Sequence, residues 1–390
     1  MNARAPDLSS KLPNVGTTIF TVMSALATER KAINLGQGFP DFNCDPGIVN
    51  AVTQAMQQGF NQYPPMAGAE PLRQAVAQKI ASLYGASYNP QTEVTIAAGG
   101  TEAIFSAVQA VVRPGDEVIV LEPCYDSYIP AISLAGGTVV TVPLTPGTFR
   151  PDFAAIESAL STKTRLLIIN TPHNPSAVVW HDHELLQLQA LLEKTDTLLL
   201  SDEVYEHMVY APGQHLSVSQ YPGLYARAFV VSSFGKTFHV TGWKLGACVA
   251  PAALTQEFRK VHQFNVFTVN TPMQHGVANY MANPQTYTSL PSFYGAKRDR
   301  FRQGMQSTAF ELLDCQGSFF QCARYDGLRI AERNLNEYDF CIWLTEEMGV
   351  AAIPLSVFYS SGFEQTTIRF CFAKQESTLD EAIKRLQRLG

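Results

Sequence analysis

The feature of this chain that most constrains its fold is a regular alternation, between about residues 90 and 250, of short apolar runs with segments of helical pattern. Apolar strands that alternate with helices form βαβ units, and consecutive units build a mostly parallel sheet with helices on both faces. The strand-like runs are 94–96, 117–121, 138–142, 166–169, 197–200 and 228–231. The sequence therefore predicts an α/β fold, with a mostly parallel sheet sandwiched by helices.

A second, smaller domain is expected after the sheet domain. A chain of 390 residues with 46% hydrophobic content can bury a large core and divide into two domains. Apolar residues at helical spacing between 292 and 313 predict a long helix that leads out of the sheet domain. Thr378-Leu379-Asp380-Glu381 has the pattern of a capping box at the start of a last helix, whose apolar stripe continues to Leu389. The first dozen residues are polar and contain proline, so an arm or a disordered segment is expected there.

Composition and charge argue against several classes of partner. The net charge of −6 comes without a basic cluster, so neither nucleic acid nor an anionic membrane surface is expected to bind. The chain has no apolar run long enough to span a membrane, and its opening residues lead into no hydrophobic signal core. We therefore expect a cytoplasmic protein.

The cysteines and histidines favour a protein without a metal centre. The 7 cysteines are scattered and never spaced as Cys-x-x-Cys, which favours reduced, mostly buried thiols over disulfides or structural zinc. His181-Asp182-His183-Glu184 could suggest a metal site, but it stands where a strand gives way to a helix. A polar helix start is the favoured interpretation, and no metal is expected.

Lys236 is the first candidate for chemistry, because small residues bring it out at the end of the apolar run 228–231. Open α/β sheets bind ligands at the carboxyl ends of their strands, so a lysine there can form a covalent bond with a bound molecule. Gly235-Lys236-Thr237 also imitates the end of a P-loop, but Val230 stands where that motif requires a glycine. A solvated loop lysine is the alternative, which this segment alone leaves open.

Other reactive side chains follow other predicted strands, so they should meet Lys236 at one edge of the sheet. Asp202 and Tyr205 follow the run 197–200, and Asn174 follows the run 166–169. Taken singly, Asp202 could be a helix cap, Arg369 a surface ion pair and Gly99-Gly100 merely a turn. The joint placement of reactive side chains after neighbouring strands argues for one site.

This set of groups fits the needs of pyridoxal 5′-phosphate, a cofactor that requires an amine, a carboxylate, donors to its phenolate and a phosphate cradle. Lys236 would form an imine with it, and Asp202 would keep its ring nitrogen protonated so that the ring accepts electrons. Asn174 and Tyr205 would donate hydrogen bonds to the phenolate oxygen. The phosphate would bind where a helix opens after the run 94–96. The candidates for the phosphate are Gly99, Gly100, Thr101, Ser233 and Lys244.

Further motifs extend the pattern over nearly the whole chain. In order they are Thr17-Thr18-Ile19-Phe20, 34–42, Asn61-Gln62-Tyr63, Asn174-Pro175, Asp202-Glu203-Val204-Tyr205, 231–237, Gly242-Trp243-Lys244, 352–358 and Arg369. On these motifs the chain resembles the class I, fold-type I pyridoxal-phosphate aminotransferases, and within them the kynurenine, glutamine and methionine aminotransferases. The resemblance implies a large cofactor-binding domain at 47–290. It also implies a small α+β domain built from both chain ends, with 1–46 as the N-terminal arm and part of that domain and 291–390 as the rest.

The resemblance also implies roles for individual residues. Lys236 would be the Schiff-base lysine and the base that moves the substrate α-proton. Arg369 would bind the substrate α-carboxylate as a two-pronged donor, and Asn174 and the backbone at Gly38 would approach the same carboxylate. Tyr125 would stack on the cofactor ring.

The same resemblance implies a homodimer with shared active sites. Tyr63 and Phe267 would reach the site from the second subunit, Tyr63 toward the phosphate and Phe267 toward the substrate. The segment 261–296 contains no Lys, Arg, Asp or Glu, and by the resemblance part of it lines the pocket for the substrate side chain. A dicarboxylic substrate would find no partner there, whereas Phe20, Phe264 and Phe267 suggest an apolar, polarizable pocket.

The sequence therefore favours an enzyme that passes the amino group of methionine, and less efficiently of aromatic amino acids, to a 2-oxo acid. A carbon–sulfur β-lyase on the same scaffold uses the same lysine and carboxylate, so it stays open as an alternative. A regulatory protein that keeps the fold without catalysis is disfavoured, because Lys236, Asp202 and Arg369 are all present.

Overall fold

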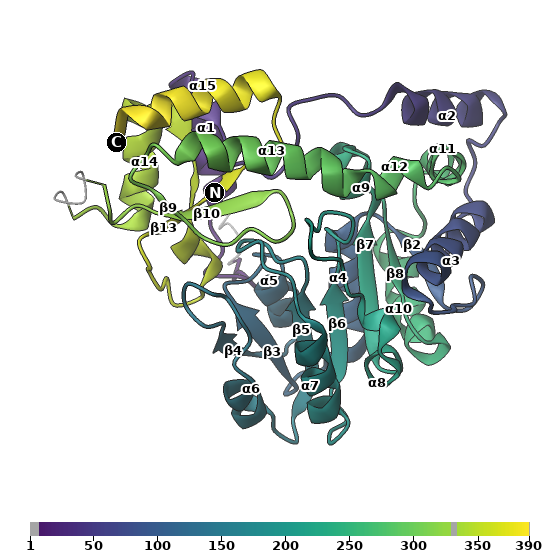
Figure 1. The fold of residues 1–390 in the computed structure, drawn as a ribbon. Helices are drawn as coiled ribbons and strands as arrows, with labels where there is room; N and C mark the ends of the chain where they lie inside the picture. Colours follow the sequence, from purple (N-terminus) through teal and green to yellow (C-terminus); the bar gives the residue numbers. More distant parts are fainter. Residues whose placement is uncertain (1–7, 329–333, 390) are drawn as a thin grey trace, which may run out of the picture.

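The structure, a computed structural model, describes residues 8–328 and 334–389, and its larger part is organised around a seven-stranded sheet (Figure 1). The strand order is β2-β8-β7-β6-β5-β3-β4, and β8 runs antiparallel to both of its neighbours while the other pairs are parallel. The strands are Val94–Ala97 (β2), Glu117–Glu122 (β3), Thr138–Pro143 (β4), Thr164–Asn170 (β5), Leu198–Asp202 (β6), Ala228–Ser233 (β7) and Gly246–Val249 (β8). The predicted mostly parallel sheet is confirmed, and each predicted run overlaps one of these strands.

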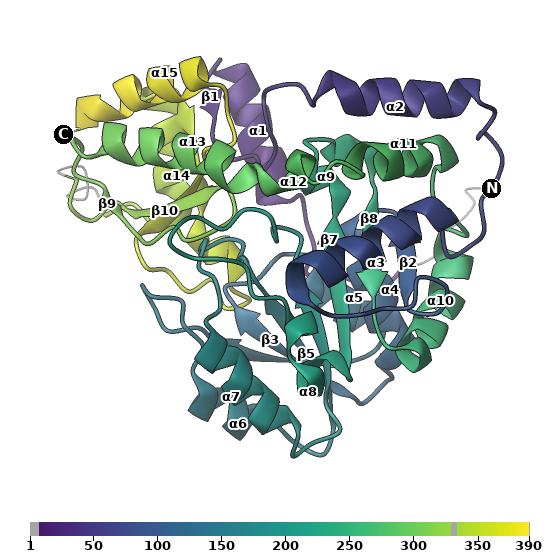
Figure 2. The same cartoon turned by 45° about the vertical axis from the view of Figure 1, so that its right-hand side comes forward.

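Strand residues alternate between two apolar cores, one on each face of the sheet. Leu166 and Ile168 of β5 belong to one core, and Leu167 and Ile169 belong to the other. Since both faces are covered, the strands carry nearly continuous apolar runs instead of alternating polar and apolar residues. One face is covered by α4 (Gly100–Val111), α5 (Tyr128–Leu134) and α10 (Ala252–Asn265), and the other by α3 (Glu70–Tyr84), α6 (Phe153–Ala159), α7 (Asp182–Leu192) and α8 (Pro222–Tyr225) (Figures 1 and 2).

The smaller domain contains residues from both ends of the chain, as predicted. β1 (Ile33–Asn34) pairs in parallel with β11 (Val350–Ala351), and a separate antiparallel sheet has the order β12-β13-β10-β9. The strands of that sheet are Glu311–Leu312 (β9), Phe320–Arg324 (β10), Ile353–Pro354 (β12) and Thr367–Cys371 (β13). The helices here are Ile19–Glu29 (α1), Glu337–Glu347 (α14) and Glu376–Leu386 (α15), and Figure 1 shows α15 lying along α13 (Leu290–Met305). The remaining helices are Pro46–Gln57 (α2), Phe234–Thr237 (α9), Thr271–Met281 (α11) and Gln285–Thr288 (α12).

The helix predicted over 292–313 is shorter than expected. It corresponds to α13, which ends at Met305, and the chain then enters β9. The hydroxyl of Thr308 donates a hydrogen bond of 2.7 Å to the carbonyl oxygen of Met305, so a side chain takes up a carbonyl at the helix end. Of the apolar positions beyond this point, Leu312 lies in β9 and Ala309 lies in the bend before it.

The capping box predicted at 378–381 is wrong. The last helix, α15, begins at Glu376 with Gln375 as its N-cap, three residues before the predicted N-cap Thr378. Thr378 therefore lies inside the first turn, and its hydroxyl donates to Oδ2 of Asp41 at 2.7 Å. The side chain of Thr378 therefore connects α15 to the segment after β1 and does not cap the helix.

The polar helix start predicted at 181–184 is confirmed, because the backbone N–H of His181 donates to Oε2 of Glu184 at 2.7 Å as α7 begins. His181, His183 and Glu184 bring possible ligand atoms within 4.8 Å of one another, but the Glu184 carboxylate already accepts from Nε of Arg150 at 2.8 Å.

All seven cysteines are free thiols. Of the expected N-terminal arm, residues 1–7 lie outside the described residues, and residues 8–18 form neither helix nor strand. Within the described ranges, every helix is too short or too polar to cross a membrane.

Candidate active site

The predicted site residues gather in one cavity of about 280 Å³, formed where several strands of the large sheet end and completed by residues of the smaller domain. Parallel strands present their carboxyl ends at the same edge of a sheet, which is why side chains far apart in sequence meet there. Every predicted site residue except Tyr63, Phe264 and Phe267 lines the cavity. Those present are Phe20, Gly38, Gly99, Gly100, Thr101, Tyr125, Asn174, Asp202, Tyr205, Ser233, Lys236, Lys244 and Arg369.

Lys236 lies in α9, directly after β7, and faces the cavity. Its Nζ donates a hydrogen bond of 3.0 Å to the carbonyl oxygen of Gly38. Burial, together with the nearby cations Arg369 and Lys244, lowers the pKa of Lys236 to about 8. A lysine with this pKa is partly unprotonated near neutral pH, so it can act both as a nucleophile and as a base.

Asp202 ends β6 and is 3% exposed. The hydroxyl of Tyr128 donates to Oδ2 at 2.6 Å, and the backbone N–H of Val204 donates to Oδ1 at 3.3 Å. Burial raises the pKa of Asp202 to about 6, although both hydrogen bonds oppose the rise. A cationic partner in the cavity would favour the ionised carboxylate further.

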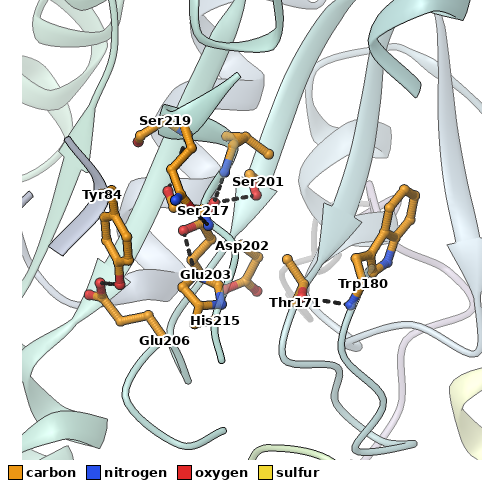
Figure 3. A network of polar contacts seen from close by, with 12 residues as sticks. Tyr84, Thr171, Trp180, Ser201, Asp202, Glu203, Glu206, His215, Ser217 and Ser219 are labelled. Atoms are coloured by element: carbon orange, nitrogen blue, oxygen red, sulfur yellow. Dashed lines mark hydrogen bonds and ion pairs between the residues drawn. The ribbon is translucent and has the colours of Figure 1, made fainter. Parts of the chain in front are cut away.

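Buried polar contacts hold the turn that follows β6 (Figure 3). The carboxylate of Glu203 accepts from the Ser201 hydroxyl at 2.9 Å and contacts Nε2 of His215 at 2.8 Å. Glu206 accepts from the hydroxyl of Tyr84, on α3, at 2.7 Å. Because a buried carboxylate left without partners is costly, these bonds fix the backbone that presents the end of β6 to the cavity.

Asn174 lies on the loop after β5. Its backbone N–H donates to Oδ1 of Asn170 at 2.7 Å, and the Thr171 hydroxyl accepts from the backbone N–H of Trp180 at 3.2 Å, which closes the loop (Figure 3). Oδ1 of Asn174 accepts from Nη1 of Arg369 at 2.6 Å. The amide NH₂ of Asn174 is therefore the group left to donate to a molecule in the cavity.

The N-terminus of α4 offers a site for an anion. Gly99 is the N-cap with φ of +87°, and a Cβ on Gly100 would lie only 2.9 Å from a methyl carbon of Val204. Glycine at these positions lets a ligand approach the backbone N–H groups of the first turn, which have no partner within the helix. Nζ of Lys244 would be 3.5 Å from a Cβ built on Gly99, so a cation stands beside the same turn.

Two tyrosines border the cavity. The hydroxyl of Tyr125 is 3.2 Å from the Thr101 hydroxyl, and burial raises the pKa of Tyr125. Tyr205 is 3% exposed, and burial raises its pKa well above the usual value for tyrosine. Both phenols therefore stay protonated and can donate hydrogen bonds at neutral pH.

Arg369 stands on β13 and is 1% exposed. Besides its bond to Asn174, it donates from Nη2 to the carbonyl oxygen of Gly36 at 3.0 Å. Its Nε is buried and has no hydrogen-bond partner among the described residues. A buried guanidinium with an unused donor is suited to binding a carboxylate.

Three exposed aromatic residues lie outside the cavity. The exposed fractions are 81% for Tyr63, 45% for Phe267 and 86% for Phe264. The rings of Tyr63 and Phe267 are in edge contact, with centroids 5.2 Å apart. Their contribution to the site of a second subunit stays a prediction.

The donors and acceptors of the cavity fit pyridoxal phosphate. Lys236 supplies an amine of lowered pKa, Asp202 a buried carboxylate, and Asn174 an amide donor, while the glycine cradle with Lys244 suits a phosphate.

Sequence reasoning missed Tyr128 and Phe320, although Tyr128 bonds to Asp202 and Phe320 lines the cavity. Each is a single aromatic residue in an apolar neighbourhood, and such residues are usually part of a core. The tyrosine carries one weak signal, since a buried phenol needs a hydrogen-bond partner.

The chain is similar to known aminotransferases in sequence and in structure. The family model of aminotransferase class I and II matches residues 30–386. Methionine aminotransferase from Escherichia coli is 49% identical over 381 residues, which cover 97% of this chain and 98% of the relative. A crystal structure from Escherichia coli, reported to identify a methionine aminotransferase function, has a TM-score of 0.96 at 47% identity and covers 99% of this chain and 100% of that chain.

Less similar relatives also match this chain over most of its length. A probable N-succinyldiaminopimelate aminotransferase from Mycobacterium tuberculosis is 39% identical and covers 98% of both chains. Kynurenine–oxoglutarate transaminase 3 from Rattus norvegicus is 34% identical over 96% of this chain and 88% of the relative.

Proposed function

The chain belongs to the class I and II aminotransferases, and we propose that it transfers the amino group of methionine, and less efficiently of aromatic amino acids, to a 2-oxo acid with pyridoxal 5′-phosphate as cofactor. The observation that supports this most is that Lys236, Asp202 and Arg369 line one cavity although they come from three separate elements. An amine, a carboxylate and a carboxylate-binding cation are the groups that amino-group transfer on this cofactor requires.

Each side chain has a task that follows from its surroundings. Pyridoxal phosphate, when bound, supplies an electron-withdrawing ring that makes the substrate α-proton removable. Lys236 would hold the cofactor and carry that proton on Nζ, for which a pKa near 8 is well placed. Asp202 would face the ring nitrogen as an anion, kept in position by Tyr128. Arg369 would orient the α-carboxylate, with Asn174 fixed beside it.

The cofactor would also be held at its phenolate and phosphate ends. Asn174 and Tyr205 would donate to the phenolate oxygen, and Tyr125 would cover the ring. The first turn of α4 would bind the phosphate through backbone N–H groups, with Lys244 and Ser233 nearby.

The choice of methionine rests on what the cavity lacks and on what it contains. The described residues that line the cavity include three cations, Arg369, Lys236 and Lys244. Arg369 is assigned to the substrate α-carboxylate, and the two lysines are assigned to the cofactor. A second carboxylate on the substrate would have no cation to meet. Phe20 offers an aromatic ring, which a thioether contacts favourably. The relative named for methionine, at 49% identity, supports the same donor.

A screen of amino donors with several 2-oxo acids tests this function. The purified protein loaded with pyridoxal phosphate should convert methionine to its 2-oxo acid and phenylalanine more slowly, and the Lys236→Ala variant should convert neither. Robust turnover of aspartate would refute the substrate assignment. Release of pyruvate and ammonia from cystathionine, without transamination of methionine, would identify the β-lyase instead.

We also propose that the enzyme is a homodimer in which Tyr63 and Phe267 complete the partner's site. Large aromatic side chains as exposed as these are typical of an interface. Mixing an inactive Lys236→Ala subunit with a subunit inactivated at Phe267 should restore some activity, because mixed dimers would contain one intact site. If mixed dimers form and stay inactive, the sites are not shared in this way.

A further inference from the structure

Three aromatic rings surround the guanidinium of Arg369. Its Cζ lies 3.9 Å from the ring centroid of Phe320, 5.0 Å from that of Phe358 and 5.4 Å from that of Phe20. No aspartate or glutamate of the described residues lies within 4.0 Å of the guanidinium. We call Phe20, Phe320 and Phe358 the aromatic enclosure of Arg369.

The enclosure is assembled from three elements. β10 and β13 are antiparallel with Phe320 opposite Cys371 and Cys322 opposite Arg369, so Phe320 and Arg369 point to the same face, two residues apart along the ladder. Phe358 ends the short 3₁₀ helix Leu355–Phe358 that follows β12, and Phe20 belongs to α1. The enclosure therefore forms only when both chain ends are folded.

The aromatic rings stabilise the buried guanidinium without occupying its hydrogen-bond donors, which a carboxylate would occupy. A buried guanidinium needs compensation for the water it has lost, and the electron-rich faces of the rings supply part of it. A permanently paired carboxylate would compensate more strongly, but it would occupy the donors that a substrate carboxylate must use. The rings leave these donors uncovered, and Nε has no hydrogen-bond partner among the described residues.

Phe320 has the closest contact and two further ones. A Cβ built on Gly38 would lie 3.0 Å from Cζ of Phe320, so the ring also packs against the backbone at Gly38. Its ring stands at 78° to that of Tyr205, with centroids 5.8 Å apart.

We propose that Phe320, assisted by Phe358 and Phe20, is a positioning residue that keeps Arg369 fixed and free of internal carboxylates, so that it binds the carboxylate of every donor and acceptor. This rests on the proposed function, which assigns Arg369 to the substrate carboxylate. The enclosure then sets the affinity for any carboxylate, whatever the side chain attached to it. Later proton transfer, which depends on Lys236, should be affected much less.

The test compares binding of hexanoate and hexanamide to the protein loaded with pyridoxal phosphate. These probes share an uncharged chain, and only hexanoate carries the charge that Arg369 recognises. Phe320→Leu should weaken hexanoate binding by about 5- to 30-fold, the range of a desolvated cation–π contact, and leave hexanamide within about twofold. Phe358→Leu should weaken hexanoate by a smaller factor.

Phe370 provides the matched control. It follows Arg369 on β13 and is fully buried, but it packs against Phe301 and Phe310, with centroid distances of 5.6 and 5.9 Å. Phe370→Leu removes the same ring volume from the strand that carries Arg369, so it should lower stability and leave hexanoate affinity unchanged. In Phe320→Leu, KM should rise equally for methionine and phenylalanine, with kcat changed much less.

Two results would overturn the proposal. One is a hexanoate affinity of Phe320→Leu within twofold of that of the unmodified protein. The other is an equal loss of affinity for hexanoate and hexanamide, which would mean that Phe320 only contributes to the shape of the cavity. If Phe320→Leu does not fold, the same comparison on Phe358→Leu decides. Failure of the proposed function looks different, because the unmodified protein would then bind hexanoate in preference to hexanamide and still not transaminate methionine.

Discussion

Replacing Lys236 with methionine should make the cofactor-free protein more stable while abolishing its turnover. In the folded chain, burial is the largest cause that lowers the pKa of Lys236 from 10.5 to about 8. At about 1.4 kcal/mol for each pH unit, keeping this ammonium charged at neutral pH costs about 3 kcal/mol of folding free energy. Methionine fills similar space without charge and gives up one hydrogen bond to the Gly38 carbonyl, worth about 1 kcal/mol. The expected net gain at pH 7 is about 2 kcal/mol.

The gain should depend on pH in a defined direction. The folded chain releases the Lys236 proton near pH 8, whereas the unfolded chain keeps it to about pH 10.5. Between these values the unfolded state binds more protons, so the free energy of unfolding of the unmodified protein rises with pH. The advantage of Lys236→Met should therefore be largest below pH 8 and fade as the pH approaches 10.5.

Urea denaturation of the cofactor-free proteins, followed by circular dichroism at pH 7 and pH 10, measures this difference. Lys163→Met, at an exposed lysine, serves as the control and should show no such gain. A Lys236→Met variant that is less stable at pH 7, or whose advantage is the same at both pH values, would refute the reasoning that Lys236 is held charged at an energetic cost.

The other predictions concern the groups around Lys236. Asp202→Asn should retain much of the cofactor but exchange the substrate α-proton far more slowly, and exchange at the unmodified rate would contradict the role of Asp202. Tyr128→Phe removes a hydrogen bond of 2.6 Å from Asp202, so the pKa of that carboxyl should rise further. Exchange of the substrate α-proton should slow, but less than in Asp202→Asn. The pH profile of α-proton exchange measures both the pKa and the rate. Arg369→Lys keeps the charge but loses the two-pronged geometry, so kcat/KM should fall strongly and by similar factors for methionine and phenylalanine. A loss confined to one of these two amino donors would mean that Arg369 contacts the substrate side chain instead of the α-carboxylate.

The large sheet was predictable because its strands are buried on both faces. Runs such as 166–169 are apolar throughout, and a short apolar run of this kind indicates either a strand covered on both faces or a segment of a buried helix. β8, Gly246–Val249, escaped prediction because it is short and built from small residues. The start of the C-terminal helix was placed three residues late, because Thr378 matches a capping box by sequence while its hydroxyl bonds to Asp41, a partner distant in the chain.

The candidate site followed from the same logic, and its gaps have a physical cause. Asp202, Asn174 and Lys236 could be placed together because each follows a strand, and the ends of parallel strands converge. Tyr128 and Phe320 act through contacts across the fold, to Asp202 and Arg369, which no local pattern encodes. Their sequence neighbourhoods are those of ordinary core aromatics.

The most direct test of the account is the identity of the residue that bonds to the cofactor. Borohydride reduction of the protein loaded with pyridoxal phosphate, followed by peptide mass analysis, would fix that bond and locate it. The account predicts the pyridoxyl group on Lys236, with Lys244 unlabelled and Lys236→Ala carrying no label in this region. Labelling of Lys244 in the unmodified protein, or of neither lysine, would contradict it.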